Sequence, residues 1–358
     1  MKAVYVTSES YIDHSFTIVK ELSKHIDLRV FIQAREKTEE IESWCNSLNA
    51  VFIQRRRFRN PLSLFSELAF IFRLKKINPD IVWFNTLTVY QLLFVKMLIK
   101  NFLVTVHDVE IHPGAGGHGN IAAKLTLKFA LKNVCVVSKT QANIFKKNFG
   151  FEPKVFQLPI IDYHKEVSSV KSEREPKNTI RFFFFGSIEE YKGVGILLEA
   201  GGILEKKNVK FKLNIYGKIK YDEETLKKRI KTLKNITLFN EFVDYKEVHK
   251  IYIENDVLVL PYKQVTQCGP LLIAYEELVP VICSDLEGFR EYVEDNISGI
   301  IFNNSPQDLA DKMIFFIEHP ELISKIRIGI KENAHSRFLM RNLCKGYLEN
   351  LTAQSGLL

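Results

Sequence analysis

The strongest chemical signal in the sequence is a lysine that follows closely behind a glycine at the end of an apolar run. The run Ile180–Phe185 is typical of a buried strand, and Gly186 and then Lys192 come after it. A glycine in that place lets the backbone approach a ligand closely. A helix that opens near Lys192 would add free N–H groups and a positive dipole end to the lysine charge. The segment therefore predicts a diphosphate site, and an ordinary strand–helix turn with a surface lysine is the alternative.

A polar loop between two later apolar segments predicts a second anion contact. Val257–Leu260 is typical of a strand, and the helix-like Pro270–Leu278 begins after a loop that holds Thr266, Gln267 and Gly269. The backbone amides at the start of that helix would point toward a bound anion. A plain connection between strand and helix remains the alternative.

His107 and Asp108 directly follow the apolar run at 102–106. Side chains at the carboxyl ends of parallel strands reach the ligand side of the sheet. A histidine–aspartate pair there could orient a substrate hydroxyl or donate to developing negative charge, so we expect the pair to be catalytic. A structural histidine is the alternative.

Other motifs point away from dinucleotide, metal and disulfide chemistry. Gly114–Gly119 formally matches a dinucleotide fingerprint, but it starts well after the strand, and no acidic residue between Ile111 and Phe151 could hold a ribose. We expect a mobile loop there instead. The sequence has no DxD, HExxH, GxSxG or P-loop pattern, and its five cysteines are odd in number and far apart. We therefore predict no metal site and no cofactor.

Strand-like and helix-like segments alternate along the 358 residues, which predicts parallel sheets with helices on both faces. We expect an α/β fold of two Rossmann-like, doubly wound domains that face a central cleft, where ligands of such sheets bind. The expected parts are an N-terminal domain at 1–162, a linker at 163–178, a C-terminal domain at 179–335, and a final helix at 336–358 that packs back on the first domain.

The strands are expected at the apolar runs, and the clearest helices at amphipathic segments between them. The strands are predicted near 2–7, 28–33, 50–54, 80–85, 102–106, 134–137, 180–185, 211–216, 236–239, 257–260, 280–283 and 299–302. The helices are predicted at Phe16–His25, Leu62–Ile77 and Leu87–Lys100.

The formal charge of +8 and the isoelectric point near 9.0 favour an anionic partner. The basic residues are widely spread and no zinc or RNA-binding motif occurs, so we expect no nucleic-acid partner. Basic residues of the first domain could instead meet an anionic membrane, with a solvated surface as the alternative. These residues are Arg55, Arg56, Arg57, Arg59, Lys124 and Lys128.

The chain carries no obvious targeting or spanning segment. Met1–Val6 leads straight into a strand, and the longest apolar stretch, Leu87–Ile99, is too short to cross a bilayer and contains Lys96. We expect a cytoplasmic protein that is either dissolved or peripheral at the inner face of the membrane.

Taken in order, the landmarks resemble retaining GT-B glycosyltransferases of family 4 over nearly the whole chain. They are His107-Asp108, Val136–Lys139, Pro159, Phe185-Gly186 with Tyr191–Gly193, Ile215–Gly217, Asp256-Val257 with Leu260-Pro261, Pro280–Ile282, and Gly288–Glu291 with Ser298-Gly299.

The resemblance implies transfer of a sugar from a nucleotide-sugar donor to a glycan or lipid-linked acceptor, with retention and without a metal. It implies that Lys192 binds the donor diphosphate and that His107 lies beside the transferred sugar. We expect Ser10 and His14 to lie on the acceptor side. The expected donor contacts are Gly186, Ser187, Lys192, Gly217, Thr266, Gln267, Gly269 and Pro270.

The sequence departs from the family at three donor positions. Ser187 stands where the family has a diphosphate-binding arginine. Thr266 and Ala274 stand where it has two glutamates, and helical spacing turns the nearby Glu276 and Glu277 away. The segment therefore looks like a variant branch of the family.

These departures leave more than one function open. We expect an active glycosyltransferase, with a role in cell-surface polysaccharide biosynthesis. A catalytically weak or inactive protein that binds a nucleotide sugar or a partner is the main alternative. An epimerase of the same shape and a nucleic-acid-binding protein are less favoured, because neither a matched acid pair nor a binding motif is present.

Overall fold

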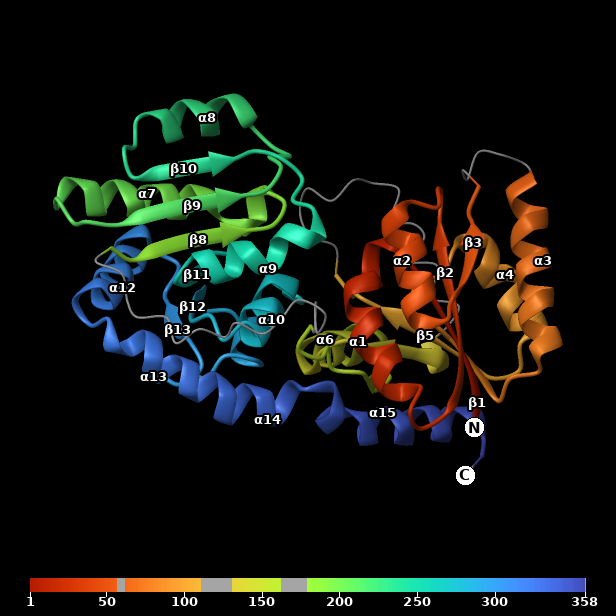
Figure 1. Ribbon diagram of the computed structural model, residues 1–358. Coiled ribbons are helices and arrows are strands. Elements are labelled where there is room, and N and C mark those ends of the chain that lie inside the picture. Colours follow the sequence, from red (N-terminus) through yellow and green to blue (C-terminus); the bar gives the residue numbers. More distant parts are fainter. Residues whose placement is uncertain (57–61, 111–130, 162–178, 358) are drawn as a thin grey trace. The chain divides into compact units, whose positions relative to one another are not determined.

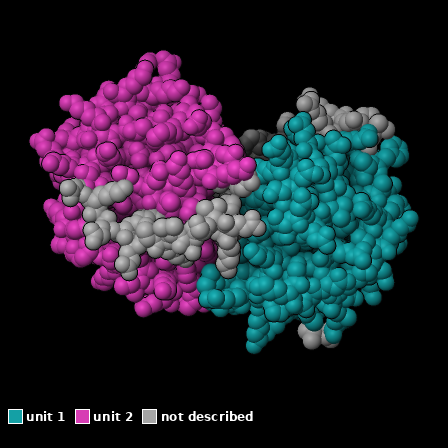
Figure 2. Space-filling view, in the orientation of Figure 1, with its two compact units in different colours: residues 1–111, 115–159, 338–358 teal, residues 112–114, 160–337 magenta. Residues whose placement is uncertain are grey.

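The computed structural model describes residues 1–56, 62–110, 131–161 and 179–357 (Figure 1). The chain forms two compact units (Figure 2). Unit 1 consists of residues 1–111, 115–159 and 338–358, and unit 2 of residues 112–114 and 160–337. The linker expected at 163–178, the glycine-rich Gly114–Gly119 segment and the basic residues Arg57, Arg59, Lys124 and Lys128 lie outside the described residues.

Unit 1 is built on a parallel sheet with the strand order β3-β2-β1-β4-β5-β6-β7. Its strands are β1 (Lys2–Ser8), β2 (Asp27–Ala34), β3 (Val51–Gln54), β4 (Ile81–Phe84), β5 (Phe102–Val106), β6 (Val134–Val136) and β7 (Lys154–Val155). Its helices are η1 (Glu9–Tyr11), α1 (Ile12–Leu22), α2 (Glu39–Leu48), α3 (Leu62–Ile77), α4 (Val89–Leu98), η2 (Leu131–Asn133), α6 (Lys139–Phe149) and α15 (Met340–Ser355).

Two apolar cores lie on the two faces of this sheet. The alternation along β1 sends Tyr5 to one face and Val4 and Val6 to the other. The first face is covered by α1, α2 and α15, and the second by α3, α4 and α6. Both faces of the strands are therefore apolar, as is usual for parallel sheets.

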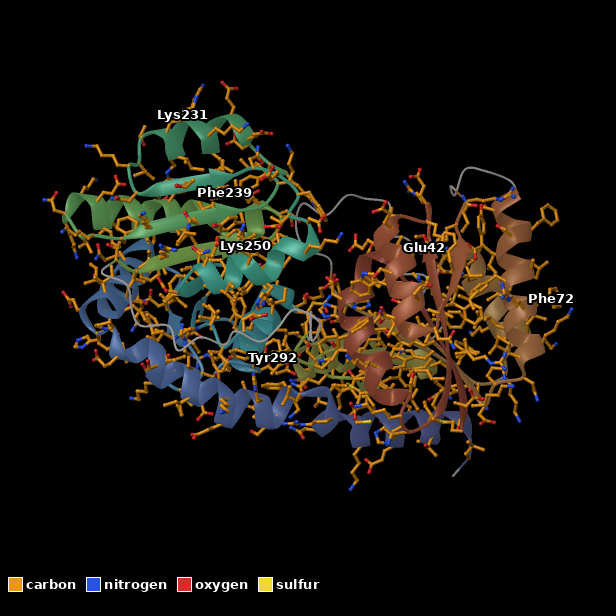
Figure 3. The ribbon with its side chains drawn as sticks, viewed as in Figure 1. Glu42, Phe72, Lys231, Phe239, Lys250 and Tyr292 are labelled. Carbon is orange, nitrogen blue, oxygen red and sulfur yellow. The ribbon has the colours of Figure 1, made fainter. Side chains whose placement is uncertain are left out.

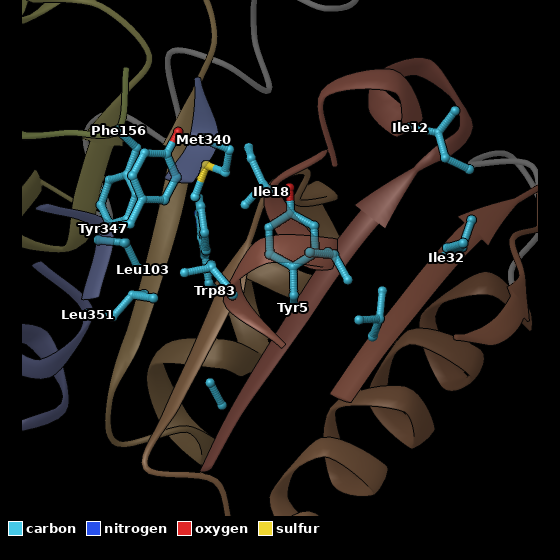
Figure 4. Close-up of a cluster of buried hydrophobic side chains, with 14 of the residues drawn as sticks. Tyr5, Ile12, Ile18, Ile32, Trp83, Leu103, Phe156, Met340, Tyr347 and Leu351 are labelled. Atoms are coloured by element: carbon cyan, nitrogen blue, oxygen red, sulfur yellow. The ribbon is translucent and has the colours of Figure 1, made fainter. Parts of the chain in front are cut away.

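The C-terminal helix α15 belongs to the first of these cores. Tyr347 packs edge-on against Phe156, with ring centroids 4.7 Å apart, and lies beside Trp83 (Figure 4). The Tyr347 hydroxyl donates to the carbonyl of Gln157 at 2.8 Å. Burial of each such large side chain contributes roughly 1.5–3 kcal/mol to folding, so α15 is an integral part of unit 1.

Unit 2 is built on a second parallel sheet, with the strand order β10-β9-β8-β11-β12-β13. Its strands are β8 (Arg181–Phe185), β9 (Lys212–Tyr216), β10 (Ile236–Phe239), β11 (Val257–Leu260), β12 (Val281–Ser284) and β13 (Ile300–Phe302). Its helices are η3 (Glu190–Lys192), α7 (Val194–Lys206), α8 (Glu223–Lys231), α9 (Tyr245–Glu254), α10 (Gly269–Glu276), α11 (Glu287–Arg290), α12 (Pro306–Glu318), α13 (Glu321–Gly329), the π-helical η4 (Ile330–Ala334) and α14 (His335–Phe338).

The prediction of two α/β domains with parallel sheets is confirmed, and every predicted strand is present. Three local differences are observed. The two-residue strand β7 was not predicted, because it does not coincide with an apolar run. Helix α1 begins at Ile12 rather than at Phe16. Helix α4 begins at Val89 rather than at Leu87, because Thr88 caps it in a capping box with Gln91. Among the described residues, no helix combines the length and the apolarity that crossing a membrane requires.

Candidate functional site

The sheet of unit 2 has a topological switch point beside β8. From β8 the chain builds β9 and β10 on one side and then places β11, β12 and β13 on the other. Ligands of doubly wound sheets bind at such a point, beyond the carboxyl ends of the strands. The turn after β8 carries Gly186 to Lys192, and the loop after β11 leads into α10. Both predicted anion segments therefore flank one switch point.

Three of the predicted donor residues meet there. Gly186 has a φ of +120°, a value that side-chain-bearing residues rarely adopt. A Cβ atom on Gly186 would lie 3.7 Å from Lys192 Nζ and 3.8 Å from Pro270 Cγ. The lysine ammonium and the first turn of α10 thus converge on the bare backbone of the β8 turn. This arrangement suits a phosphate group, which helix N-termini and lysines both bind.

Lys192 is held in place by a short polar chain. Its ammonium donates to Ser187 Oγ at 2.8 Å, and that hydroxyl donates to Glu189 Oε1 at 2.7 Å. Lys220 Nζ lies 3.6 Å from the same Glu189 oxygen. Ser187, which stands where the family that the sequence resembles has an arginine, therefore serves as the acceptor of Lys192. A ligand oxygen could take over that hydrogen bond.

The environment of Lys192 disfavours an uncompensated positive charge. Burial lowers the pKa of the ammonium from its ordinary value, Lys220 lowers it slightly further, and the opposing influences come from Glu189 and Cys268. The rings of Tyr191 and Tyr262 lie 5.8 and 5.9 Å from Nζ. A bound anion would supply a negative charge next to the buried Lys192 ammonium and so stabilise its charged form.

Gly217 has a packing role at the same place. Its φ is +144°, and a Cβ atom on it would lie 1.9 Å from the carbonyl oxygen of Gly186. The turns after β8 and β9 can approach this closely only because Gly217 has no side chain. Gly217 therefore shapes the site by permitting the approach of Gly186.

The start of α10 brings the remaining donor candidates to the switch point. Gly269 is its first residue and Pro270 follows, as suits a first helical turn. The Gln267 side-chain oxygen is buried and finds no hydrogen-bond partner among the described residues, which suits a ligand hydroxyl. The preceding Thr266 is half-buried. Burial raises the pKa of the Cys268 thiol to about 11, so this thiol is no base at neutral pH.

No carboxylate stands at the second glutamate position of the family that the sequence resembles. Ala274 is completely buried in α10. Nearby, Glu277 Oε1 lies 2.8 Å from His249 Nδ1, within hydrogen-bond distance. That the neighbouring Glu276 and Glu277 turn away from this position stays a prediction from helical spacing.

Unit 1 has its own switch point, between β1 and β4. His107 follows β5, and its ring is stacked on Tyr11, with centroids 3.8 Å apart. His107 Nε2 lies 3.1 Å from the carbonyl oxygen of Asn85, the residue after β4. Burial and the charge of Asp108 raise the pKa of the Tyr11 phenol. Tyr11, His107 and Asp108 therefore form one group over the ends of β1, β4 and β5.

Tyr11 was missed by the sequence analysis. Its position in the sequence could have indicated it, because Tyr11 lies in the short segment directly after β1, at the switch point of the sheet. An aromatic residue there can span the end of β4 and reach the residue after β5. The sequence offers no pattern for that contact, since the two rings come from segments far apart in the chain.

A buried network of hydrogen-bonded hydroxyl groups supports the Tyr11–His107–Asp108 group. Ser15 Oγ lies 2.8 Å from Thr7 Oγ1 and 3.1 Å from the Tyr5 hydroxyl. Asn85 Nδ2 donates to Thr7 Oγ1 at 3.2 Å. The network ties β1, α1 and the end of β4 together and so fixes the Asn85 carbonyl.

The two predicted acceptor-side residues lie close to each other in the chain but differ in burial. Ser10 is exposed in η1. His14 is half-buried in α1, and its Nδ1 is buried without a hydrogen-bond partner among the described residues. Burial lowers the pKa of His14 from 6.5 to about 4. His14 is therefore neutral at physiological pH.

A polar hollow of about 280 Å³ lies elsewhere on unit 2. Its lining comes from β8, β9 and the start of β10 and from the end of α9, and it includes Tyr216 at the carboxyl end of β9. None of the candidate donor residues lines the hollow. Its lining residues are Arg181, Lys212, Asn214, Tyr216, Lys234, Asn235, Thr237, Glu254 and Asn255.

Comparison with known proteins supports the observed fold and shows to which domain family most of unit 2 is similar. Residues 179–319 match the family described as Glycosyl transferases group 1. No protein of curated function matches the chain in sequence. The match to the family covers the whole switch point of unit 2, with both anion segments.

Solved structures match nearly the whole chain. A glycosyltransferase from Rickettsia africae ESF-5 is 18% identical, with a TM-score of 0.76 over 99% of this chain and 98% of that one. Anabaena Alr3699/HepE in complex with UDP-glucose is 15% identical, with a TM-score of 0.77 over 99% and 100%. The UDP-GlcNAc 2-epimerase from Neisseria meningitidis is also 15% identical, with a lower TM-score of 0.61 over 99% and 100%. The chain thus has the two-domain α/β fold of GT-B glycosyltransferases, and its residues 179–319 form a glycosyl transferase group 1 domain.

Proposed function

We propose that this protein is a retaining, metal-independent glycosyltransferase of family 4 that transfers a hexose from a nucleotide sugar to a glycan or lipid-linked acceptor. The observation that carries the proposal is the convergence of Lys192 Nζ, Gly186 and Pro270 at the switch point of the matched domain. The likeness to Alr3699/HepE, which was crystallised with UDP-glucose, supports a nucleotide-sugar donor. Retention and the lack of a metal or cofactor rest on the sequence resemblance.

The donor diphosphate would take the place that Ser187 holds as the acceptor of Lys192. The lysine would then pair with a phosphate oxygen, while the first-turn amides of α10 face the same group. Negative charge on the diphosphate grows as the bond between the sugar and the diphosphate breaks. Fixed donors aimed at that charge stabilise the transition state more than the ground state.

The acceptor side would be formed by the Tyr11–His107–Asp108 group and by Ser10 and His14. Because the Asn85 carbonyl can only accept, His107 Nε2 carries the proton in that hydrogen bond. The imidazole would then lie beside the transferred sugar, as the resemblance implies. Stacking on Tyr11 fixes the plane of the imidazole.

We further propose that the product enters a cell-surface polysaccharide and that the enzyme works at the cytoplasmic face of a membrane. A lipid-linked acceptor would require that location. Of the basic residues considered from the sequence, Arg55 and Arg56 are described, and both lie just after β3. They could contact anionic headgroups.

A second candidate is a nucleotide-sugar-binding protein without turnover. The complete burial of Ala274 favours it, because no carboxylate can act at that position. The serine at position 187 also leaves one charge-assisted phosphate contact unmade. Both candidates share the donor site and differ in whether nucleoside diphosphate is released.

A thermal-shift screen against UDP-, GDP-, ADP- and dTDP-sugars tests the donor site. We expect one nucleotide class to raise the melting temperature, as any ligand that binds only the folded state does. Lys192→Ala should weaken that nucleotide by about tenfold or more, because a hydrogen bond to a charged group contributes roughly 1.5–3 kcal/mol. Lys212→Ala, an exposed lysine at the start of β9, is the matched control.

Two results would count against the proposal. If no nucleotide sugar stabilises the fold, the donor site is misassigned. If Lys192→Ala binds as tightly as the parent, the diphosphate lies elsewhere. Release of nucleoside diphosphate on addition of a glycan or lipid-linked acceptor then separates the enzyme from the binding protein.

A further inference from the structure

Unit 1 exposes a ridge of large apolar side chains along α3 and α4. The exposed fractions are 67% for Phe65, 45% for Phe72, 54% for Leu93 and 80% for Met97. Phe65 and Phe72 lie about two turns apart on α3, and Leu93 and Met97 about one turn apart on α4. The two helices pack against each other, so the four side chains belong to one surface. We call these four residues the α3–α4 ridge.

The ridge lies opposite to the core-facing sides of the same helices. Phe70, Ile71 and Leu74 of α3 and Leu92 and Val95 of α4 are buried against the sheet. Both helices are therefore apolar on two sides, whereas a helix on a water-facing surface is polar on its outer side. Figure 3 shows Phe72 projecting from α3 away from the strands. A patch of this kind marks an interaction surface.

Positive charges lie next to the ridge. Exposed cations occur in the later turns of α3 and α4 and just after α4, and they are Arg73, Lys75, Lys76, Lys96 and Lys100. Between Leu62 and Lys100 the sequence has two acidic residues, Glu67 and Asp80.

Neither acidic residue offsets this charge at the surface. Glu67 is buried and accepts a hydrogen bond from Gln91 Nε2 at 2.7 Å. Asp80 accepts from the backbone N–H of Lys2 at 2.7 Å, at the start of β1. The outer side of α3 and α4 is thus apolar and cationic.

This combination selects lipid over another protein copy. In a symmetric dimer the same patch would face itself, and the five cations of one copy would meet those of the other. An anionic bilayer instead offers acyl chains to the apolar side chains and phosphates to the cations. We propose that the α3–α4 ridge inserts into the interfacial region of a membrane that contains anionic lipid, with Phe65 and Met97 reaching deepest. This inference extends the proposed membrane location and does not depend on the proposed sugar transfer.

Co-sedimentation of the full chain with lipid vesicles tests the proposal. We expect binding to vesicles of equimolar phosphatidylcholine and phosphatidylglycerol, and much weaker binding to phosphatidylcholine alone. Added salt should weaken the binding because it screens the cations. The assay contains no nucleotide sugar or acceptor, so its outcome is independent of whether the protein is an enzyme.

Matched variants separate the apolar and the ionic contributions. Phe65→Gln combined with Met97→Gln should lower vesicle partitioning by about tenfold or more, since each side chain loses a large part of its apolar burial. Ile328→Gln, an exposed apolar residue of unit 2 that is 56% exposed, should leave it unchanged.

For the charges, Lys75→Glu combined with Lys100→Glu should lower binding to the mixed vesicles by about tenfold. Lys231→Glu on α8 of unit 2 is the control, and Figure 3 shows this lysine on the outer side of its helix. These positions are exposed, so unchanged far-UV circular dichroism and melting temperature confirm that the variants fold.

Three outcomes overturn the inference. One is a parent protein that stays in the supernatant with both kinds of vesicle. Another is equal vesicle binding by the Phe65/Met97 variant and the parent. A third is a dimer on size-exclusion chromatography that this variant converts to a monomer, because the ridge would then be covered by a second copy of the chain.

Discussion

The ring of Tyr11 lies flat against the imidazole of His107, with centroids 3.8 Å apart and planes inclined by 13°. The two residues come from the loops after β1 and β5, and the end of β4 lies between them. The stack and the Asn85 carbonyl together leave the imidazole one orientation. A catalytic histidine needs such support, because small misplacements of a reacting group slow the reaction strongly.

Tyr11→Ala should therefore reduce kcat/KM for sugar transfer by about tenfold to a hundredfold, which corresponds to the loss of one oriented contact. Tyr11→Phe keeps the ring and should retain most of the activity. Steady-state kinetics with the nucleotide sugar found in the binding screen gives both values. Equal activity of the alanine variant and the parent would show that the stack does not position the histidine.

Ser187→Arg should tighten nucleotide-sugar binding. The arginine would stand where the related family has its diphosphate-binding guanidinium, and a charge-assisted pair contributes roughly 1.5–3 kcal/mol, or about tenfold or more in affinity. Isothermal titration calorimetry measures the change. Ser187→Ala is the control, because it removes the serine from Lys192 without adding a charge. Unchanged or weaker binding by the arginine variant would place the diphosphate away from the turn after β8.

The stability of unit 1 should fall in mild acid because of His14. Burial lowers the pKa of its imidazole from 6.5 to about 4, so the unfolded chain takes up a proton at a higher pH than the folded one. Stability is therefore full above the unfolded value and declines as the pH falls from there to the folded value. The loss reaches up to about 3 kcal/mol.

His14→Gln should remove this acid sensitivity. Urea unfolding followed by circular dichroism, at neutral pH and in the acid range between the two pKa values, compares the variant with the parent. The difference in unfolding free energy between the two proteins should change with pH in favour of the variant. Parallel pH profiles would mean that His14 titrates in the same way in the folded and unfolded states.

Gly217→Ala should destabilise unit 2 severely, by about 3 kcal/mol or more, because its Cβ would overlap the Gly186 carbonyl and its φ of +144° is unfavourable. Gly195→Ala is the matched substitution. It stands in α7 with no heavy atom within 4 Å of the added Cβ, and should stabilise by about 0.5–1 kcal/mol. Chemical denaturation measures both. A Gly217→Ala protein as stable as the parent would contradict the close contact of the two turns.

The strands were predictable because strands buried in a parallel sheet consist of nearly continuous apolar residues. Arg181–Phe185 is an example. Helix α3 was predicted with its observed bounds, Leu62–Ile77. The helix expected to open near Lys192 instead begins at Val194, because Gly193 adopts a left-handed conformation between η3 and α7. A Cβ there would lie 1.8 Å from the Pro261 carbonyl, a long-range constraint that local sequence does not display.

The candidate donor site was more predictable than the candidate acceptor group for a related reason. Gly186 and Lys192 are close in the chain, so their spacing alone brings them to one turn. Tyr11 and His107 meet only after β1, β4 and β5 have been assembled side by side. Contacts that depend on strand order require the topology, which periodicity does not encode.

Because Tyr347 and its helix complete the core around Trp83 and Phe156, the order of synthesis matters for this protein. A ribosome emits the strands of unit 1 first, then all of unit 2, and only then α15. Unit 2 can therefore fold while one face of the sheet of unit 1 is not yet covered by α15. During that interval the apolar side chains around Trp83 lack their cover from α15, and exposed apolar surface of this kind promotes aggregation.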